Sequence, residues 1–199
     1  MIGITGPTGA GKTTALRELE HLGGCILDAD AVYHQLLEED RELRSALFAR
    51  FGAMEDAEGR FDRKRLGAIV FQDEKAMADL NAITHNYMTR EVERRLEQAR
   101  QMGYPVAAVD AIRLFESGLD ALCDVTLAII APAEVRINRI MVREGISEEY
   151  ARARVRAQPP NSFYTRICNY TLVNDSVSAK AFGMRCRELF ESILQEGID

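Results

Sequence analysis

The sequence predicts an α/β protein built on a five-stranded parallel sheet. Five short apolar stretches occur along the 199 residues, and amphipathic helical patterns lie between them. Most of these stretches are continuously apolar rather than alternating, which is typical of parallel strands covered by helices on both faces. A glycine-rich segment, GPTGAGKT at 6–13, directly follows the first stretch. Together these observations indicate a three-layer sandwich with a ligand site at the carboxyl ends of its strands.

The spacing of the strands predicts how the chain is organised. The five stretches are 2–5, 25–28, 106–110, 125–130 and 170–174. A charged segment with helical periodicity, about 31–103, separates the second strand from the third, and an arginine-rich helical segment, about 132–168, precedes the fifth. We therefore expect one unit over 1–199 with two helical insertions. The core is predicted to comprise residues of about 1–30, 104–131 and 169–199.

Composition excludes several classes of protein. The net charge of −6 and pI of about 5.2 do not support a basic nucleic-acid-binding face. The longest apolar runs, such as VTLAIIA, are too short to span a bilayer, and the N-terminus lacks the pattern of a signal peptide. The cysteines are scattered without a C-x-x-C pair, so no zinc or redox motif is predicted: Cys25, Cys123, Cys168 and Cys186. We expect a cytoplasmic protein, monomeric or a small homo-oligomer, without nucleic-acid or membrane partners.

The segment 6–13 fits the phosphate-binding P-loop pattern G-x-x-x-x-G-K-[ST], and Thr14 adds a second hydroxyl. Glycines let the backbone curl so that its N–H groups converge on phosphate oxygens, and the following helix adds the positive end of its dipole. Lys12 is then expected to reach the β- and γ-phosphates, and the Thr13 hydroxyl to bind Mg²⁺. The alternative is a glycine-rich turn that matches by accident, but the strand before it and the helix after it favour the P-loop.

Carboxylates follow two of the other predicted strands. Asp28 and Asp30 end the second strand, and alternation in an extended chain sends both the same way. Such a carboxylate can accept a proton from an attacking hydroxyl or hold Mg²⁺ through water, whereas the alternative is a helix N-cap. Asp110 ends the third strand, where a Walker-B carboxylate would contact the Mg²⁺ shell.

Arginines in the second insertion are candidates for phosphoryl transfer. Arg139 and Arg143 are four residues apart and share a helix face, with Arg136 close by. Such arginines neutralise charge on the transferring group, although a solvated basic face is the alternative. His85 stands alone in the first insertion, and a lone histidine is more often a structural or surface residue than a ligand.

A set of motifs along the chain points to one family. They are ITGPTGAGKTT at 4–14, LDAD at 27–30, EGRFDRKRL at 58–66, LNAITH at 80–85, DAIRLFE at 110–116, the Arg139/Arg143 pair and Gln158. In order and spacing the chain resembles the dephospho-CoA kinase family over nearly its whole length. The resemblance implies a P-loop three-layer sandwich with a helical substrate-binding insertion and a small helical lid. It also implies ATP and dephospho-CoA as substrates, Mg²⁺ as cofactor, and phosphorylation of the ribose 3′-hydroxyl in the last step of coenzyme A biosynthesis.

The resemblance also implies residue roles, with Asp30 as the general base on the 3′-hydroxyl. The residues implied to bind ATP are Gly9, Ala10, Gly11, Lys12, Thr13, Thr14 and Asn174. Those implied to bind the acceptor are Asp30, Arg63, His85, Leu114 and Glu116. Those implied to be catalytic are Lys12, Asp30, Arg139 and Arg143.

The chain departs from the family pattern at Asn86, Arg113 and 168–176. These departures keep two alternatives open: a P-loop kinase for another small acceptor, such as a nucleoside or nucleotide, and a non-catalytic nucleotide-binding relative. The intact Lys12 and Asp30 argue against the second.

Overall fold

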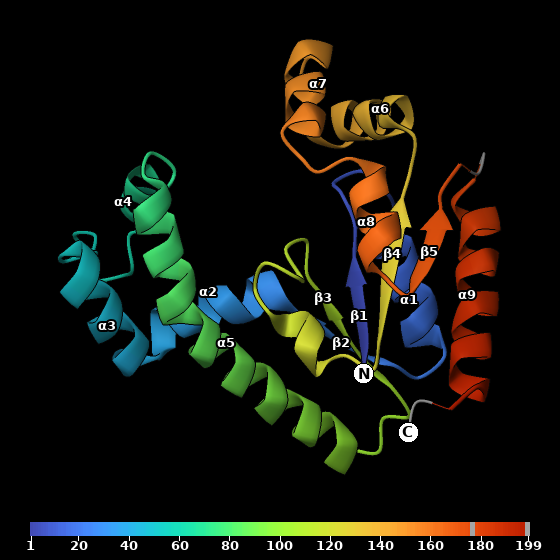
Figure 1. The fold of residues 1–199 in the computed structure, drawn as a ribbon, viewed down its shortest axis with the longest axis horizontal. Helices are drawn as coiled ribbons and strands as arrows, with labels where there is room; N and C mark the ends of the chain where they lie inside the picture. Colours follow the sequence, from blue (N-terminus) through green and yellow to red (C-terminus); the bar gives the residue numbers. More distant parts are fainter. Residues whose placement is uncertain (176–177, 198–199) are drawn as a thin grey trace. The chain divides into compact units, whose positions relative to one another are not determined.

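The computed structural model describes residues 1–175 and 178–197. Residues 176–177 and 198–199, which fall in the predicted core segment 169–199, lie outside the described residues. A five-stranded sheet has the order β2-β3-β1-β4-β5 (Figure 1). Its strands are β1 (Ile2–Thr5), β2 (Cys25–Asp28), β3 (Ala107–Asp110), β4 (Val125–Ile130) and β5 (Tyr170–Val173). The predicted parallel α/β sheet is confirmed.

Helices occupy the segments between the strands. They are α1 (Lys12–His21), α2 (Ala29–Glu39), α3 (Arg41–Phe51), α4 (Arg63–Val70), α5 (Glu74–Gln101), the 3-10 helix η1 (Leu119–Leu122), α6 (Ala133–Glu144), α7 (Glu148–Arg156), α8 (Asn161–Ile167) and α9 (Ala179–Gln195). Within the described ranges, none of these helices combines the length and apolarity needed to cross a bilayer.

The chain divides into two compact units: Met1–Leu27 with Ala99–Asp199, and Asp28–Gln98. The first unit holds the sheet and its three layers. On one face, Ile2 and Ile4 of β1 pack with Leu19 of α1 and with Phe182 and Phe190 of α9, and all five are fully buried. On the other face, α8 packs on β4 (Figure 1). This explains why β1 is buried at every position, since both of its faces are covered.

The position of β1 determines where the P-loop begins. β1 is the central strand, paired with β3 on one side and β4 on the other. Its register aligns Ile4 with Asp110 of β3 and Thr5 with Ala128 of β4. The loop that follows Thr5 therefore emerges between the carboxyl ends of two neighbouring strands, where open α/β sheets bind ligands.

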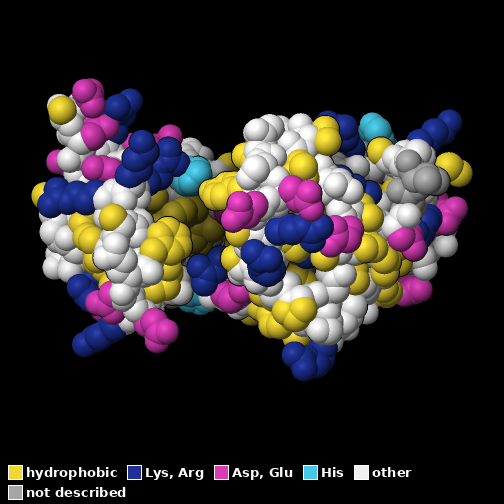
Figure 2. Space-filling view, turned by 90° about the horizontal axis from the view of Figure 1, so that it is seen from above, with side chains coloured by type: hydrophobic (Ala, Val, Ile, Leu, Met, Phe, Trp, Pro, Cys, Tyr) yellow, Lys and Arg dark blue, Asp and Glu magenta, His cyan; other side chains and the backbone are white. Residues whose placement is uncertain are grey.

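The second unit has a helical core of its own. Val32 of α2 and Leu43 and Leu47 of α3 are fully buried. The rings of Phe48 and Phe61 stack with centroids 6.1 Å apart. Basic and acidic side chains are intermingled on the face of the molecule shown in Figure 2. Several exposed ion pairs form between such side chains.

One such group of ion pairs predicts a pH-dependent contribution to stability. Glu91 of α5 accepts hydrogen bonds from Arg94 and Arg95 at 2.7–2.8 Å, and these bonds lower the pKa of the carboxyl from 4.5 to about 2. Because the folded-state pKa is depressed, the stabilisation is full above pH 4.5 and is lost as the pH falls toward 2. Glu91→Gln should lower the free energy of unfolding at pH 7 by roughly 0.5–1 kcal/mol, since solvent screens surface pairs.

Urea unfolding at pH 7 and at pH 3.5 checks this, and the gap between wild type and variant should narrow at the lower pH. Glu93→Gln, at an exposed neighbouring position on α5, is the control. A gap that is independent of pH would contradict the prediction.

Candidate active site

The loop between β1 and α1 has the shape of a phosphate cradle. Gly6, Gly9 and Gly11 all have positive φ angles, of 137°, 81° and 107°. A Cβ on Gly11 would lie 2.2 Å from the Asn174 side chain, so the loop needs glycine there for space as well as for conformation. Gly11 has no side chain to cap α1, so the positive end of the helix dipole faces the loop without a side-chain cap, which favours an anion there.

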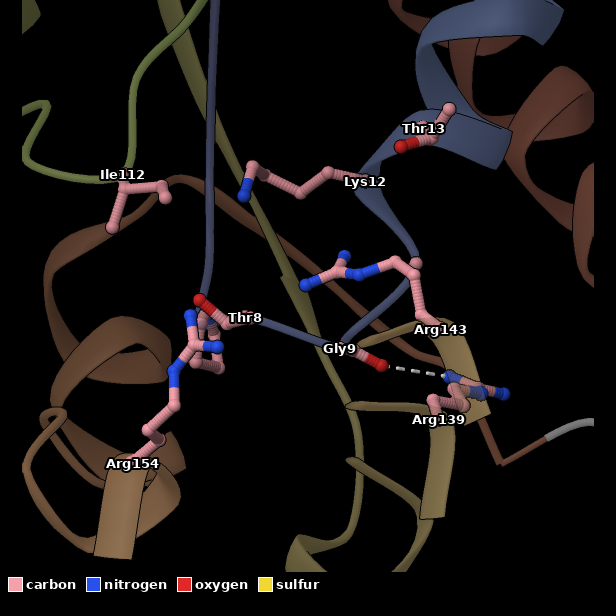
Figure 3. Close-up of a pocket in the computed structure, with 10 residues that line it drawn as sticks. Thr8, Gly9, Lys12, Thr13, Ile112, Arg139, Arg143 and Arg154 are labelled. Atoms are coloured by element: carbon pink, nitrogen blue, oxygen red, sulfur yellow. Dashed lines mark hydrogen bonds between the residues drawn. The ribbon is translucent and has the colours of Figure 1, made fainter. Parts of the chain in front are cut away.

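A cavity of about 400 Å³ opens over this loop. It is lined by Pro7, Thr8, Gly9, Gly11, Lys12, Thr13, Ile112, Arg139, Arg143 and Arg154. In Figure 3 the charged ends of Lys12 from α1, Arg143 from α6 and Arg154 from α7 point into the same space. All of these residues belong to the first unit, and the cations they bring together fit a polyphosphate.

Arg139 is held on the loop itself. Its guanidinium donates to the carbonyl oxygens of Gly9 and Ala10 at 3.2 and 3.3 Å and to the Asn174 side chain at 3.1 Å (Figure 3 draws the Gly9 bond). The buried Asn174 donates in turn to the Ala10 carbonyl at 2.8 Å. Burial lowers the pKa of Arg139 from its ordinary value. Arg139 and Asn174 thus support the loop, and an adenine contact by Asn174 stays a prediction.

Arg143 and Arg154 share one carboxylate. Glu144 accepts a hydrogen bond from Arg143 at 2.6 Å and also pairs with Arg154. The Arg143 bond, followed by the Arg154 charge, lowers the pKa of Glu144. Because exposed pairs of this kind contribute little stability, either arginine can exchange Glu144 for a phosphate at small cost. Sequence reasoning did not select Arg154, because its place beside the pocket depends on the packing of α7 against α6.

A second set of contacts joins the lid helices to the loop at Thr8. The Thr8 N–H donates to Gln158 Oε1 at 3.1 Å, and Gln158 Nε2 donates to the Thr8 hydroxyl at 3.0 Å. Arg136 donates to the Thr8 carbonyl at 3.0 Å and to Gln158 Oε1 at 2.6 Å. Spacing had placed Arg136 beside the Arg139/Arg143 pair as one of three neighbouring arginines; in the structure Arg136 is 3% exposed and its guanidinium is bonded to the loop.

Four other predicted residues belong to the first unit, and two of them lie beside β1. Thr13 is exposed at the cavity, and Asp110 ends β3 beside Ile4. Leu114 is fully buried, and a Cβ on Gly3 would lie 2.8 Å from it, so it fills the space over β1. Glu116 is exposed.

The remaining predicted residues belong to the second unit. Asp28 caps α2, because its Oδ1 accepts from the Ala31 N–H at 3.0 Å. Asp30 lies in the first turn of α2 and is exposed, so the cap proposed as an alternative role for these carboxylates belongs to Asp28. Arg63 begins α4 and His85 lies on α5, and both are exposed.

Comparison with known proteins identifies the family. The family model for dephospho-CoA kinase matches residues 1–180. The chain belongs to the dephospho-CoA kinase family. It is 34% identical over 192 residues to a dephospho-CoA kinase of Corynebacterium diphtheriae, with 96% of each chain covered.

Solved structures agree with the dephospho-CoA kinase family. A Thermus thermophilus protein has a TM-score of 0.77 at 30% identity, with 100% of this chain and 97% of that chain covered. A dephospho-CoA kinase from Campylobacter jejuni has a TM-score of 0.71 at 26% identity, covering 98% and 97%. The expected fold, family and kinase class are therefore confirmed.

Proposed function

We propose that this kinase transfers the γ-phosphoryl group of ATP to the ribose 3′-hydroxyl of dephospho-CoA, giving coenzyme A and ADP. One observation carries the proposal: in a chain that matches the family over residues 1–180, Lys12, Arg143 and Arg154 converge on a cavity above a P-loop. Phosphoryl transfer depends mostly on positioning and on neutralising charge, and this cavity is suited to both.

The loop supplies the ATP contacts. Lys12 Nζ donates to the Gly6 carbonyl at 3.2 Å, which holds the ammonium over the loop. The loop residues from Gly9 to Thr14, Lys12 among them, are proposed to bind the phosphate oxygens. Arg143, as predicted, and Arg154 are proposed to neutralise the terminal phosphate, while Arg139 supports the loop beneath it.

The residues at the cavity fit Mg²⁺ arriving with ATP. Mg²⁺ is usually held by one or two protein oxygens, phosphate oxygens and several waters. The exposed Thr13 hydroxyl at the cavity meets that need, with Asp28 or Asp110 proposed to act through water. Among the residues described, no group of three or more His, Cys, Asp or Glu side chains is arranged as a metal site, which agrees with a metal held largely by the nucleotide. When bound, Mg²⁺ would neutralise charge on the β- and γ-phosphate oxygens.

Asp30 is the proposed general base. It follows the end of β2 by two residues, is exposed, and leaves the capping of α2 to Asp28. A carboxylate at that position is suited to accept the proton of the attacking hydroxyl. Arg63, His85 and Glu116, which are exposed, are proposed to contact the acceptor, as the family resemblance implies. Leu114, predicted with them, is fully buried against β1 and is not open to a ligand. We also propose a cytoplasmic location, supported by four free thiols.

A coupled ADP-release assay with ATP, Mg²⁺ and dephospho-CoA tests the function. We expect ADP release that depends on the acceptor and a product heavier by one phosphoryl group by mass spectrometry, assigned as the 3′-phosphate by co-elution with coenzyme A. Nucleosides and nucleotides serve as competing acceptors. ADP release with nucleosides but not with dephospho-CoA would contradict the proposed acceptor, and no acceptor-dependent release despite ATP binding would favour a non-catalytic relative.

A further inference from the structure

Thr8 of the P-loop is held by the lid through all of its polar groups. Its N–H donates to Gln158, its hydroxyl accepts from Gln158, and its carbonyl accepts from Arg136. Because the Thr8 N–H donates to Gln158, this amide stabilises the first part of the loop and does not bind a phosphate. Thr8 therefore links the loop and the lid.

The two lid helices that carry the cavity arginines meet at this one residue. Arg136 lies in the first turn of α6, the helix that carries Arg143. Gln158 follows the end of α7, the helix that carries Arg154, and its N–H bonds to the Val155 carbonyl in the last turn of α7. Each helix thus has its own connection to Thr8.

The lid behaves as one body because α6 and α7 share a core. The buried side chains of that core are Ile137, Ile140, Ala151 and Val155. The backbone of α6 also reaches the loop directly, because a Cβ on Gly9 would lie 2.9 Å from the Arg136 carbonyl oxygen. Because Arg139 of α6 is also bonded to the loop, losing the Gln158 connection is expected to shift chiefly the α7 end of the pair over the cavity.

Breaking the contacts among Arg136, Gln158 and Thr8 has a high free-energy cost. Arg136 is 3% exposed, and its guanidinium is satisfied by two neutral oxygens, the Thr8 carbonyl and Gln158 Oε1. Gln158 Oε1 is the oxygen that both Arg136 and the Thr8 N–H share. A buried guanidinium that loses such an acceptor keeps its desolvation cost without compensation. The arrangement therefore favours one fixed position of the lid.

We propose that Gln158 is a positioning residue for the terminal phosphate of the nucleotide: by holding the end of α7 on Thr8, it keeps Arg154 and Arg143 directed into the cavity. The proposal rests on the proposed function only in that the cavity takes ATP. It predicts a selective loss of affinity for the triphosphate, because the arginines would face the γ-phosphate while the loop holds the inner ones. A merely structural role would instead lower thermal stability and weaken all nucleotides alike.

The test measures the affinities of Gln158→Met, which keeps the length of the side chain without its polar atoms. Affinities are measured by calorimetry in the presence of Mg²⁺. The affinity for a non-hydrolysable ATP analogue should fall about tenfold, as expected for the loss of more than one hydrogen bond. The affinity for ADP should fall less than about threefold. Thr8→Val, which removes only the hydroxyl, should lose about fivefold for the ATP analogue, and Thr8→Ser should retain more affinity than Thr8→Val. Gln195→Met, an exposed glutamine at the end of α9, is the matched control.

Coupling to Arg143 gives the second readout. Arg143→Ala should lower the affinity for the ATP analogue in both the wild type and Gln158→Met. The fold-loss should be several times smaller in Gln158→Met, because Arg143 is already displaced in that variant. Equal losses for ATP analogue and ADP, or additive effects of the two substitutions, would overturn the proposal. Since these measurements use nucleotides alone, a wild-type protein inactive on dephospho-CoA would overturn the proposed acceptor without affecting this test.

Discussion

Asp30→Asn is expected to reduce kcat by about 10²–10⁴-fold, the usual contribution of a positioned general base. Affinity for an ATP analogue should stay within about threefold, because the phosphate contacts come from the P-loop and lid. The asparagine keeps the shape of the side chain and loses only its ability to take the proton. Steady-state kinetics with dephospho-CoA, together with calorimetry for nucleotide binding, separates the two effects.

Asp28→Asn is the matched control for this prediction. Asp28 makes the cap on α2 through Oδ1, and asparagine caps helices about as well as aspartate. We therefore expect little change in stability and a much smaller loss of turnover than in Asp30→Asn. Full turnover in Asp30→Asn would remove Asp30 as the base, and an equal loss in both variants would show that the carboxylates act together.

The fold was readable from the sequence because a buried parallel strand is apolar at nearly every position. The predicted strands 2–5, 25–28 and 125–130 coincide with β1, β2 and β4. The P-loop was readable for a different reason: its glycines and lysine act locally, within one turn of chain. By contrast, the bounds of the helical insertion, about 31–103, stay a prediction, and the structure divides into compact units at Asp28 and Gln98. Such boundaries depend on how helices pack, which periodicity does not specify.

The site was only partly predictable, because its supporting contacts join distant segments. Thr8 and Gln158 are 150 positions apart, and no spacing rule relates them. Local rules also could not choose between Asp28 and Asp30 as the helix cap, since both residues suit that role. Spacing also could not separate the three neighbouring arginines of α6: Arg136 is buried and bonded to the loop, whereas Arg143 lines the cavity. Burial is a property of the assembled lid, so only the structure could supply it.

Gly6→Ala is expected to disable nucleotide binding and to lower stability. Gly6 has a φ of 137°, and an added Cβ would lie 2.0 Å from the Ile129 carbonyl oxygen. That oxygen belongs to β4, which is paired on both sides, so the loop has to move instead. Backbone strain and steric overlap together should cost about 3 kcal/mol or more. The Gly6 carbonyl also holds Lys12, so ATP-analogue affinity should fall by about tenfold or more, as for loss of a charge-assisted contact.

Gly103→Ala separates the strain of a positive φ from the displacement of the loop. Gly103 has a φ of 78° in the turn between α5 and β3, and an added Cβ would meet nothing within 4 Å. Only the left-handed conformation is then penalised, by about 1–2 kcal/mol, and ATP-analogue affinity should be unchanged. Thermal unfolding and calorimetry on both variants therefore distinguish two causes. Suppose that Gly6→Ala has a Tm no lower than that of Gly103→Ala and binds the ATP analogue with wild-type affinity. Then the contact between Gly6 and β4 does not keep the loop in its phosphate-binding conformation.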